Sequence, residues 1–416
     1  MIAMRSYALV TVAYWAFTLT DGALRMLVLL HFNALGYSPI QLAFLFLLYE
    51  FFGVVTNLVG GWLAARMGLN VTLLGGLALQ IVSLAMLVFV RPEWTVAVSV
   101  AYVMAAQALS GIAKDLTKMS SKSAIKTLVP ADASSSLFKW VAILTGSKNA
   151  LKGVGFFLGG FLLTTLGYIW ALWAMAIGLG VILLWMLVVL PRELGKAKSK
   201  AKFSTLLSKN RNINVLSAAR FFLFGSRDIW FVVAVPVFLS NTLNWNFTQA
   251  GTFLALWVIG YGIIQSVTPA LIRRWTHGRA PQGRAALVLA LLLAVVTALI
   301  PLGLMAGWPP ETVVLGGLAL YGAIFAVNSS VHSYLILAYS DGDKVALNVG
   351  FYYMANAGGR LIGTLLSGLM YQYGGLSGCL WTSVGFVVAT ALLSMLLPAS
   401  TPEMELSAVA DSGGID

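Results

Sequence analysis

Charged residues are scarce in this chain, and cysteine is almost absent. Only 10% of the 416 residues are charged, whereas 59% are hydrophobic, which excludes an ordinary soluble domain. The single cysteine, Cys379, excludes an intramolecular disulfide and a cluster of several thiolates around one metal ion. The sequence also lacks a glycine-rich phosphate loop with its lysine and a His-Glu-x-x-His motif. We therefore expect neither an enzyme nor a cofactor.

Long apolar runs are what the chain has in abundance. Each run is roughly 20 residues long, the length that crosses a bilayer as a helix. Hydropathy windows give about twelve of them, near 7–31, 40–64, 71–90, 95–117, 137–165, 167–190, 213–239, 248–270, 285–306, 311–339, 344–372 and 376–398. The first run continues into Asp21 and Arg25, so it is interpreted as a spanning helix and not as a cleaved signal. The expected fold class is an all-α integral membrane protein.

Positive charge is distributed unevenly between the loops. Lys and Arg number 26 against 14 for Asp and Glu, and most of these cations lie in alternate loops, above all in segment 191–212. The linkers 32–39, 240–247 and 373–375 contain no Lys or Arg. The positive-inside rule then predicts an inner (plasma) membrane protein with both termini in the cytoplasm. Contact with the lipid bilayer explains the net charge of +12 without a nucleic-acid partner.

The sequence repeats itself at a fixed spacing. Gln41 opens the second run and Gln249 opens the eighth, 208 positions later. The same spacing relates Arg66 to Arg274 and, in the fifth and eleventh runs, Lys152, Gly155, Gly160 and Gly167 to Arg360, Gly363, Gly368 and Gly375. An even number of spans separates the copies, so the repeat predicts two halves of six helices in the same orientation.

This repeat predicts the domain organisation. We expect an N-terminal six-helix half at 1–190, a basic cytoplasmic linker at 191–212, a C-terminal six-helix half at 213–398 and a disordered cytoplasmic tail at 399–416. Parallel halves around an axis along the membrane normal resemble the major facilitator superfamily fold, whose substrate site lies between the halves at mid-depth. The loop typical of that superfamily is only partly matched, because Ala65 stands where an acid is usual.

A second group of cations lies inside the predicted spans, where charge is costly and needs a reason. The candidates for substrate binding are Arg25, Lys148, Asn149, Lys152, Arg227 and Arg360, with Lys114 and Lys118 as a cationic funnel. Lys152 and Arg360 have no acid one turn away, which favours a contact with substrate. Asp21 and Arg25 either neutralise one another or serve the site. Arg227 and Asp228 point about 100° apart on a helix, so each is expected to meet a different group.

The acids inside the spans are candidates for carrying a coupling proton. They are Asp21, Glu50 and Asp228, although a hydrogen-bonded structural role fits Glu50 equally well. Even with these three acids, the interior keeps an excess of positive charge. That excess favours a multivalent anion, because the planar fork of arginine matches phosphate-like oxygens. Charge alone does not separate phosphate from arsenate, and it disfavours a multidrug exporter for cationic drugs.

Four segments carry a resemblance to a known family. They are Tyr14–Met26, Ala108–Asp115, Lys122–Lys126 and Gly146–Gly160. Their polar residues stand in apolar surroundings, which makes these segments more specific than a glycine pattern. With them the chain resembles, along nearly its full length, the organoarsenical efflux permeases (ArsJ type) of the major facilitator superfamily.

The resemblance implies a function. Such a permease exports 1-arseno-3-phosphoglycerate, which forms when a glyceraldehyde-3-phosphate dehydrogenase uses arsenate in place of phosphate. The permease and the dehydrogenase together would confer arsenate resistance by secondary active efflux. The alternative is an organophosphate–phosphate antiporter, since superfamily members of that kind also use central arginines.

Overall fold

The computed structural model describes residues 2–67, 69–128, 134–190, 210–275, 281–340 and 345–398. Within these ranges the regular structure is helical: α1 (Ile2–Ala34), α2 (Pro39–Met67), α3 (Leu69–Val88), α4 (Val96–Leu128), α5 (Ser134–Val189), α6 (Arg211–Phe231), α7 (Ala234–Asn241), α8 (Phe247–Trp275), α9 (Gly283–Met305), α10 (Pro310–Ala338) and α11 (Val345–Ser394). Ten stretches of the described residues are long and apolar enough to cross a membrane.

Two of these stretches are long enough to cross twice. They run over Ser147–Val189 in α5 and Asn348–Ser394 in α11, which are 43 and 47 residues long. Each contains one glycine outside helical geometry, Gly167 (φ 75°) and Gly375 (φ 58°). A positive φ is readily adopted only by glycine, so the chain reverses there without a separate loop. With both stretches counted twice, the described part of the chain accounts for the twelve expected spans.

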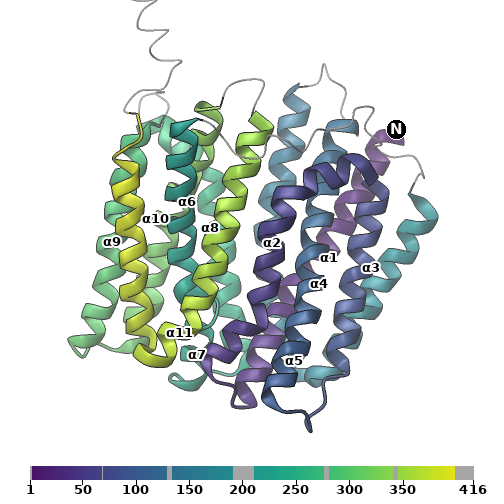
Figure 1. The fold of residues 1–416 in the computed structure, drawn as a ribbon, viewed down its shortest axis with the longest axis horizontal. Coiled ribbons are helices and arrows are strands. Elements are labelled where there is room, and N and C mark those ends of the chain that lie inside the picture. The colour runs from purple at the N-terminus through teal and green to yellow at the C-terminus, as the bar shows by residue number, and fades with distance from the viewer. Residues whose placement is uncertain are drawn as a thin grey trace, which may run out of the picture.

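The helices form two bundles that stand side by side (Figure 1). Helices α1 to α5 pack on one another, and α6 to α11 do the same. The bundles meet along two seams, in which α2 packs against α11 and α5 against α8. Of the predicted linker (191–212), residues 191–209 lie outside the described ranges, as does the whole predicted tail (399–416), and those assignments stay predictions. Helix α6 begins at Arg211, two residues before the predicted start of the C-terminal half.

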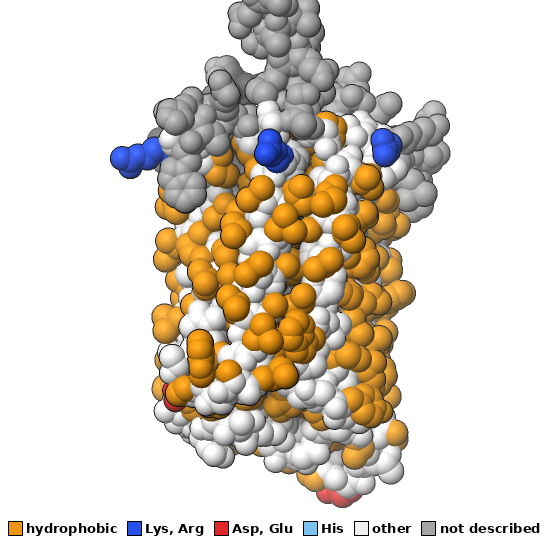
Figure 2. All heavy atoms as spheres, turned by 90° about the vertical axis from the view of Figure 1, so that its left-hand side faces the viewer, with side chains coloured by type: hydrophobic (Ala, Val, Ile, Leu, Met, Phe, Trp, Pro, Cys, Tyr) orange, Lys and Arg blue, Asp and Glu red, His pale blue; other side chains and the backbone are white. Residues whose placement is uncertain are grey.

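The lateral surface of the molecule is apolar, as a surface in contact with lipid acyl chains must be. On the face shown in Figure 2, hydrophobic side chains cover most of the height, and Lys and Arg appear at one end only. The large exposed side chains on α9 include Leu291, Val295 and Leu299, which follow one another at helical spacing. Exposed hydrophobic residues on this scale would be an aggregation liability in water.

The structure reproduces the sequence repeat at the starts of α2 and α8. Before α2, the Ser38 amide donates to Oε1 of Gln41 (2.9 Å) and the Gln41 amide donates to Oγ of Ser38 (3.4 Å). Before α8, Asn246 and Gln249 make the same reciprocal pair, at 2.9 and 2.8 Å. This is a capping box, which satisfies two backbone donors at a helix start. The two copies therefore share local geometry as well as sequence register.

The repeat also produces a symmetric closure at one end of the molecule. Asn33 and Asn241, which are 208 positions apart, exchange hydrogen bonds between their side-chain amides at 2.9 and 3.4 Å. Each residue thus contacts its own repeat copy, which places the pair on the axis that relates the two halves. We call this end, where α1 and α7 end, the Asn33 end, and the opposite end, where α8 ends, the Arg274 end.

Two glycines permit the close packing of the halves near the Asn33 end. A side-chain carbon added at Gly160 in α5 would clash with the carbonyl oxygen of Phe247 in α8. One added at Gly368 in α11 would clash in the same way with the carbonyl oxygen of Pro39 in α2. The two contacts are copies of one another under the repeat. They hold both seams shut at this end.

Replacing Gly368 with alanine is expected to destabilise this packing by about 1–3 kcal/mol, the usual cost of overpacking a tight contact. The measurement is the melting temperature of the purified protein. Gly350→Ala on the same helix is the matched control, because a side-chain carbon there would meet no atom within 4 Å. Equal melting temperatures for the two variants would contradict the close contact at Gly368.

Candidate substrate-binding site between the two halves

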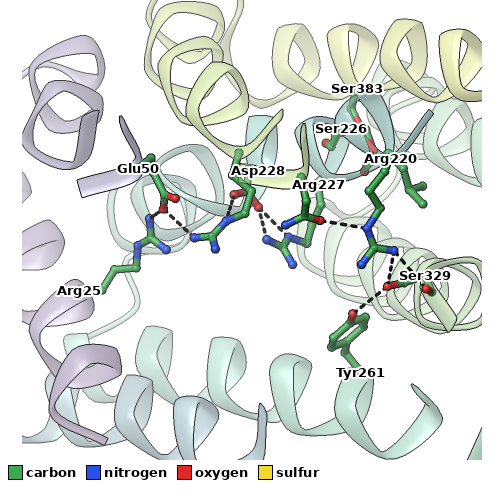
Figure 3. A network of polar contacts seen from close by, with 12 residues as sticks. Arg25, Glu50, Arg220, Ser226, Arg227, Asp228, Tyr261, Ser329 and Ser383 are labelled. Atoms are coloured by element: carbon green, nitrogen blue, oxygen red, sulfur yellow. Dashed lines mark hydrogen bonds and ion pairs between the residues drawn. The ribbon is translucent and has the colours of Figure 1, made fainter. Parts of the chain in front are cut away.

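Five charged side chains form a continuous ladder of ion pairs in the middle of the molecule (Figure 3). Nη2 of Arg25 lies 2.7 Å from Oε1 of Glu50, and Nη2 of Arg360 lies 2.7 Å from the same oxygen. Nε of Arg360 reaches Oδ2 of Asp228 at 3.2 Å. Arg227 donates from Nε to Oδ1 of Asp228 at 2.7 Å. Positive and negative groups thus alternate along the ladder.

The ladder crosses the boundary between the halves. Arg25 lies on α1 and Glu50 on α2, whereas Arg227 and Asp228 lie on α6 and Arg360 on α11. The contact between Glu50 and Arg360 therefore joins the N-terminal bundle to the C-terminal one. Any movement of one half against the other acts on this ion pair.

Glycines bring the helix backbones close enough for these side chains to meet. A side-chain carbon at Gly363 of α11 would lie 2.7 Å from the carbonyl oxygen of Gly225 and 2.9 Å from Cβ of Asp228 on α6. One at Gly155 of α5 would lie 2.6 Å from the carbonyl oxygen of Leu19 on α1. Gly155 and Gly363 are repeat copies, so the same device sets α1 against α5 and α6 against α11.

The ladder carries more positive than negative charge. Three guanidinium groups share two carboxylates, and Glu50 and Asp228 are each only 1% exposed. Buried ion pairs are tolerated when each charge has partners, but a surplus charge in a low-dielectric site remains unfavourable. The surplus here is cationic, which is the electrostatic condition for binding an anion.

The sequence prediction for Arg227 and Asp228 is wrong. Arg227 and Asp228 were expected to meet different groups, yet Nη2 of Arg227 lies 2.5 Å from Oδ1 of Asp228. The arginine side chain is long enough to turn back onto the neighbouring residue, which the helix angle alone does not reveal. Arg360 has no acid one turn away on its own helix, as the sequence shows, and it contacts two carboxylates that come from other helices.

The open question of Asp21 and Arg25 is also answered. Arg25 pairs with Glu50, and Asp21 accepts a hydrogen bond of 2.7 Å from the hydroxyl of Tyr49. Tyr49 was not among the predicted site residues. It is an aromatic residue next to Glu50 in an apolar run, and nothing in the sequence there indicates a contact with Asp21. Among the described residues, no Lys or Arg lies within salt-bridge distance of Asp21.

Lys152 adds a further cation beside the ladder. Its ammonium lies 5.6 Å from the centre of the Phe156 ring and forms no ion pair with a described carboxylate. Arg25, Arg227 and Arg360 are close enough for their charges to repel it, and the carboxylate of Asp21 is close enough to attract it. Lys148 is half-buried one turn earlier on α5, and Asn149 donates to Oε1 of Gln265 on α8 at 3.1 Å. The structure thus brings Lys152 to the ladder and places Asn149 on the second seam.

The two lysines of the predicted funnel have different surroundings. Nζ of Lys118 lies 3.2 Å from Oδ1 of Asp115 and donates to Oδ1 of Asn57 at 2.9 Å. Nζ of Lys114 lies 3.9 Å from the centre of the Tyr49 ring, the same tyrosine that donates to Asp21. Lys114 is therefore adjacent to the charged centre, whereas Lys118 is neutralised locally.

Arg220 forms a separate polar cluster in the C-terminal half (Figure 3). Its Nε donates to Oδ1 of Asn356 at 3.0 Å, and its Nη1 donates to the carbonyl oxygen and to Oγ of Ser329, both at 3.1 Å. Tyr261 and Gln265 also donate to this hydroxyl oxygen, at 3.3 and 3.4 Å. Arg220 was not among the predicted site residues, because its partners come from α10 and α11 and leave no trace in its own segment of the sequence.

His332 lies on α10, one turn beyond Asn328. Both side chains are fully buried, and none of their polar side-chain atoms has a hydrogen-bond partner among the described residues. Neither residue contacts the ladder through any described hydrogen bond.

Two helical halves with a charged site on their boundary define a secondary transporter. The family model of the Major Facilitator Superfamily matches residues 9–309 and 216–413, and the chain belongs to this superfamily. No curated protein sequence matches the chain.

Solved structures show the same fold at low sequence identity. A POT family transporter in complex with a thioalcohol-conjugated peptide superposes with a TM-score of 0.72 at 15% identity, covering 94% of this chain and 95% of that one. A D-xylose–proton symporter superposes with a TM-score of 0.70 at 15% identity, covering 96% of this chain and 98% of that one. A bacterial homologue of the iron transporter ferroportin, in an outward-facing state, superposes with a TM-score of 0.66 at 15% identity, covering 94% of this chain and 98% of that one.

Proposed function

We propose that this transporter exports an organic oxyanion, and that the substrate is 1-arseno-3-phosphoglycerate. The observation that carries the proposal is the cationic surplus of the central ladder. Three guanidinium groups share two carboxylates, and Lys152 stands beside them with no described carboxylate within salt-bridge distance. Arginine forks bind phosphate-like groups through two parallel hydrogen bonds, and arsenate has the same shape.

The segments that carry the family resemblance support the specific substrate because they pack together. Trp15, in the first segment, donates from its indole nitrogen to Oγ of Ser147, in the last one, at 2.9 Å. A side-chain carbon at Gly22 would lie 2.8 Å from the carbonyl oxygen of Lys152. Lys114, from the second segment, lies over Tyr49 next to Asp21. Residues that are distant in sequence, from segments that resemble the organoarsenical permeases, thus lie around one place.

The ladder also indicates how binding would be linked to movement. An incoming oxyanion competes with Glu50 and Asp228 for the guanidinium groups of Arg25, Arg227 and Arg360. Because the pair of Glu50 and Arg360 joins the two halves, this competition weakens a contact on the boundary. The halves then rock about the site and open the Asn33 end, which would face the outside if both termini are cytoplasmic.

Of the three acids considered for proton coupling, Asp21 is the one whose described contacts suit the role best. Glu50 and Asp228 each accept from two guanidinium groups, so protonating either would break ion pairs. Asp21 accepts from Tyr49 and has no described cationic partner within salt-bridge distance. A proton could therefore bind Asp21 without dismantling the ladder.

The test is arsenate resistance in an arsenate-sensitive bacterial strain. Cells that express this chain together with an arsenate-using glyceraldehyde-3-phosphate dehydrogenase should grow at arsenate concentrations that stop cells expressing either protein alone. Lys152→Gln should abolish the gain, because it removes a central cation that has no described carboxylate within salt-bridge distance. Arg274→Gln, an exposed cation at the Arg274 end, is the matched control and should retain it.

Two outcomes would refute the substrate assignment. One is resistance that does not depend on the dehydrogenase, which would point to another arsenic species. The other is normal resistance in Lys152→Gln cells whose membranes contain the same amount of protein as wild-type membranes.

An organophosphate–phosphate antiporter is the second candidate. The favouring observation is that Arg25 and Arg227 come from α1 and α6, the corresponding first helices of the two halves, and flank the same centre. Vesicles loaded with phosphate separate the two functions. Strict dependence of uptake on phosphate inside the vesicle would establish exchange and would exclude simple efflux.

A further inference from the structure

We infer that the cluster around Arg220 is a second oxyanion subsite, so that the transporter selects substrates with a charged group at each end of a short chain. The inference rests on the proposed function, since it supplies the place where the far end of an anion held by the ladder would bind. The ladder and the cluster are separate sets of contacts, and no described hydrogen bond joins them.

The first argument is the shortage of acceptors in the cluster. Oγ of Ser329 receives Nη1 of Arg220, the hydroxyl of Tyr261 and the amide nitrogen of Gln265. A hydroxyl oxygen has two lone pairs, so three donors exceed what it can accept well. The two longer contacts, at 3.3 and 3.4 Å, are those of Tyr261 and Gln265. A phosphate-like group offers the additional acceptor oxygens that these donors lack.

The second argument is charge. Arg25, Arg227 and Arg360 each contact a carboxylate, but Arg220 has no carboxylate within salt-bridge distance among the described residues. Its guanidinium group is nevertheless buried, with the whole residue 5% exposed. An intramembrane cation without a counter-ion is unfavourable, and such residues commonly mark substrate pathways.

The third argument is position. Guanidinium carbons of Arg220 and Arg227 lie 3.8 and 5.1 Å from the centre of the same Phe224 ring. The cluster is therefore next to one end of the ladder, on the other contact of the same aromatic ring. Gln265 also accepts from Asn149 of the other half, so a ligand at this subsite would contact the seam between α5 and α8. The chemical class selected is a short organic dianion with an oxyanion at each end.

The test compares two probes on the purified full-length protein. Inorganic phosphate has one oxyanion group, whereas 3-phosphoglycerate has a carboxylate and a phosphate at the two ends of a three-carbon chain. Binding is measured by titration calorimetry for wild type, Arg220→Gln and Tyr261→Phe. We expect Arg220→Gln to weaken the binding of 3-phosphoglycerate at least about tenfold, because a charge-assisted pair is lost. The affinity for phosphate should stay within about twofold of the wild-type value. Tyr261→Phe should have a smaller effect on 3-phosphoglycerate alone.

The unchanged binding of phosphate is the internal control for folding. If either variant lowers the affinity for both probes by the same factor, or for neither, the second subsite is refuted. Equal affinity of the wild-type protein for the two probes would refute it as well. If wild-type protein binds neither probe, the proposed anion transport itself fails, and this result is distinguishable because it precedes any comparison of variants.

Discussion

Transport should fall by about 100-fold or more when Arg360 is replaced with glutamine, because truncating a buried, hydrogen-bonded charge pair typically costs 2–5 kcal/mol. Arg360 is the only described residue that contacts both carboxylates of the ladder. Without it, Glu50 pairs with Arg25 and Asp228 pairs with Arg227, and the ladder becomes two neutral pairs. The cationic surplus of the ladder, to which we attribute anion binding, is then gone, and only Lys152 remains beside it.

The measurement is uptake of labelled 3-phosphoglycerate into inverted membrane vesicles, normalised to the amount of transporter. Arg360→Lys keeps the charge but loses the planar fork, so it should recover part of the activity and not all of it. Arg274→Gln removes an exposed cation and should leave transport unchanged. Full activity of Arg360→Gln at normal protein levels would mean that the ladder is structural and that the anion binds elsewhere.

A covalent link between positions 33 and 241 is expected to stop transport completely. The side-chain amides of Asn33 and Asn241 are 2.9 Å apart across the axis between the halves. Alternating access requires this end to open during each cycle. We expect the double variant Asn33→Cys with Asn241→Cys to lose transport on oxidation and to regain it on reduction. The native Cys379 is buried and is replaced with serine in this background.

The two single-cysteine variants are the matched controls, since neither can form the link. Both should transport equally well before and after oxidation. A short bifunctional thiol reagent replaces direct oxidation if the two sulfur atoms do not meet. To verify the cross-link, the chain is cut in segment 191–209, and linked halves then still run together on a gel. Continued transport by protein that is cross-linked in this way would contradict opening at the Asn33 end.

Much of the architecture could be predicted because it depends on local patterns. Apolar runs of spanning length and the spacing of 208 positions were sufficient to predict two six-helix halves. The same spacing relates Gln41 to Gln249, whose capping boxes have matching geometry. It also relates Gly160 to Gly368, which pack against corresponding residues of the opposite half. A repeat in sequence implies a repeat in contacts, since each copy must bury the same surface.

The pairing of charges could not be predicted, because it depends on contacts between distant parts of the chain. Glu50 and Arg360 are 310 positions apart, and nothing near either residue indicates the other. Asp21 stood one turn from Arg25, yet it bonds Tyr49 instead. Which partner a side chain contacts depends on the direction in which it points across a helix interface. Sequence spacing indicates only which residues are neighbours on the same helix.

Arg220 was underestimated for a related reason. Its partners Ser329 and Asn356 are uncharged, and small polar residues are common in membrane helices as packing contacts. A surplus of donors around one hydroxyl oxygen becomes visible only when the side chains are in place. The sequence could indicate that a cation lay in the membrane but not that its surroundings lacked acceptors.

The reciprocal amide pair of Asn33 and Asn241 has a consequence for the origin of the chain. A residue that meets its own copy across an axis is the signature of an isologous contact, the kind found in symmetric homodimers. In an ancestral six-helix protein, a single asparagine could have bonded in this way to the same asparagine of a second copy, before the gene was duplicated and fused. Separately expressed halves would then inherit a self-complementary surface, which favours pairing of like with like as well as reassembly of the whole.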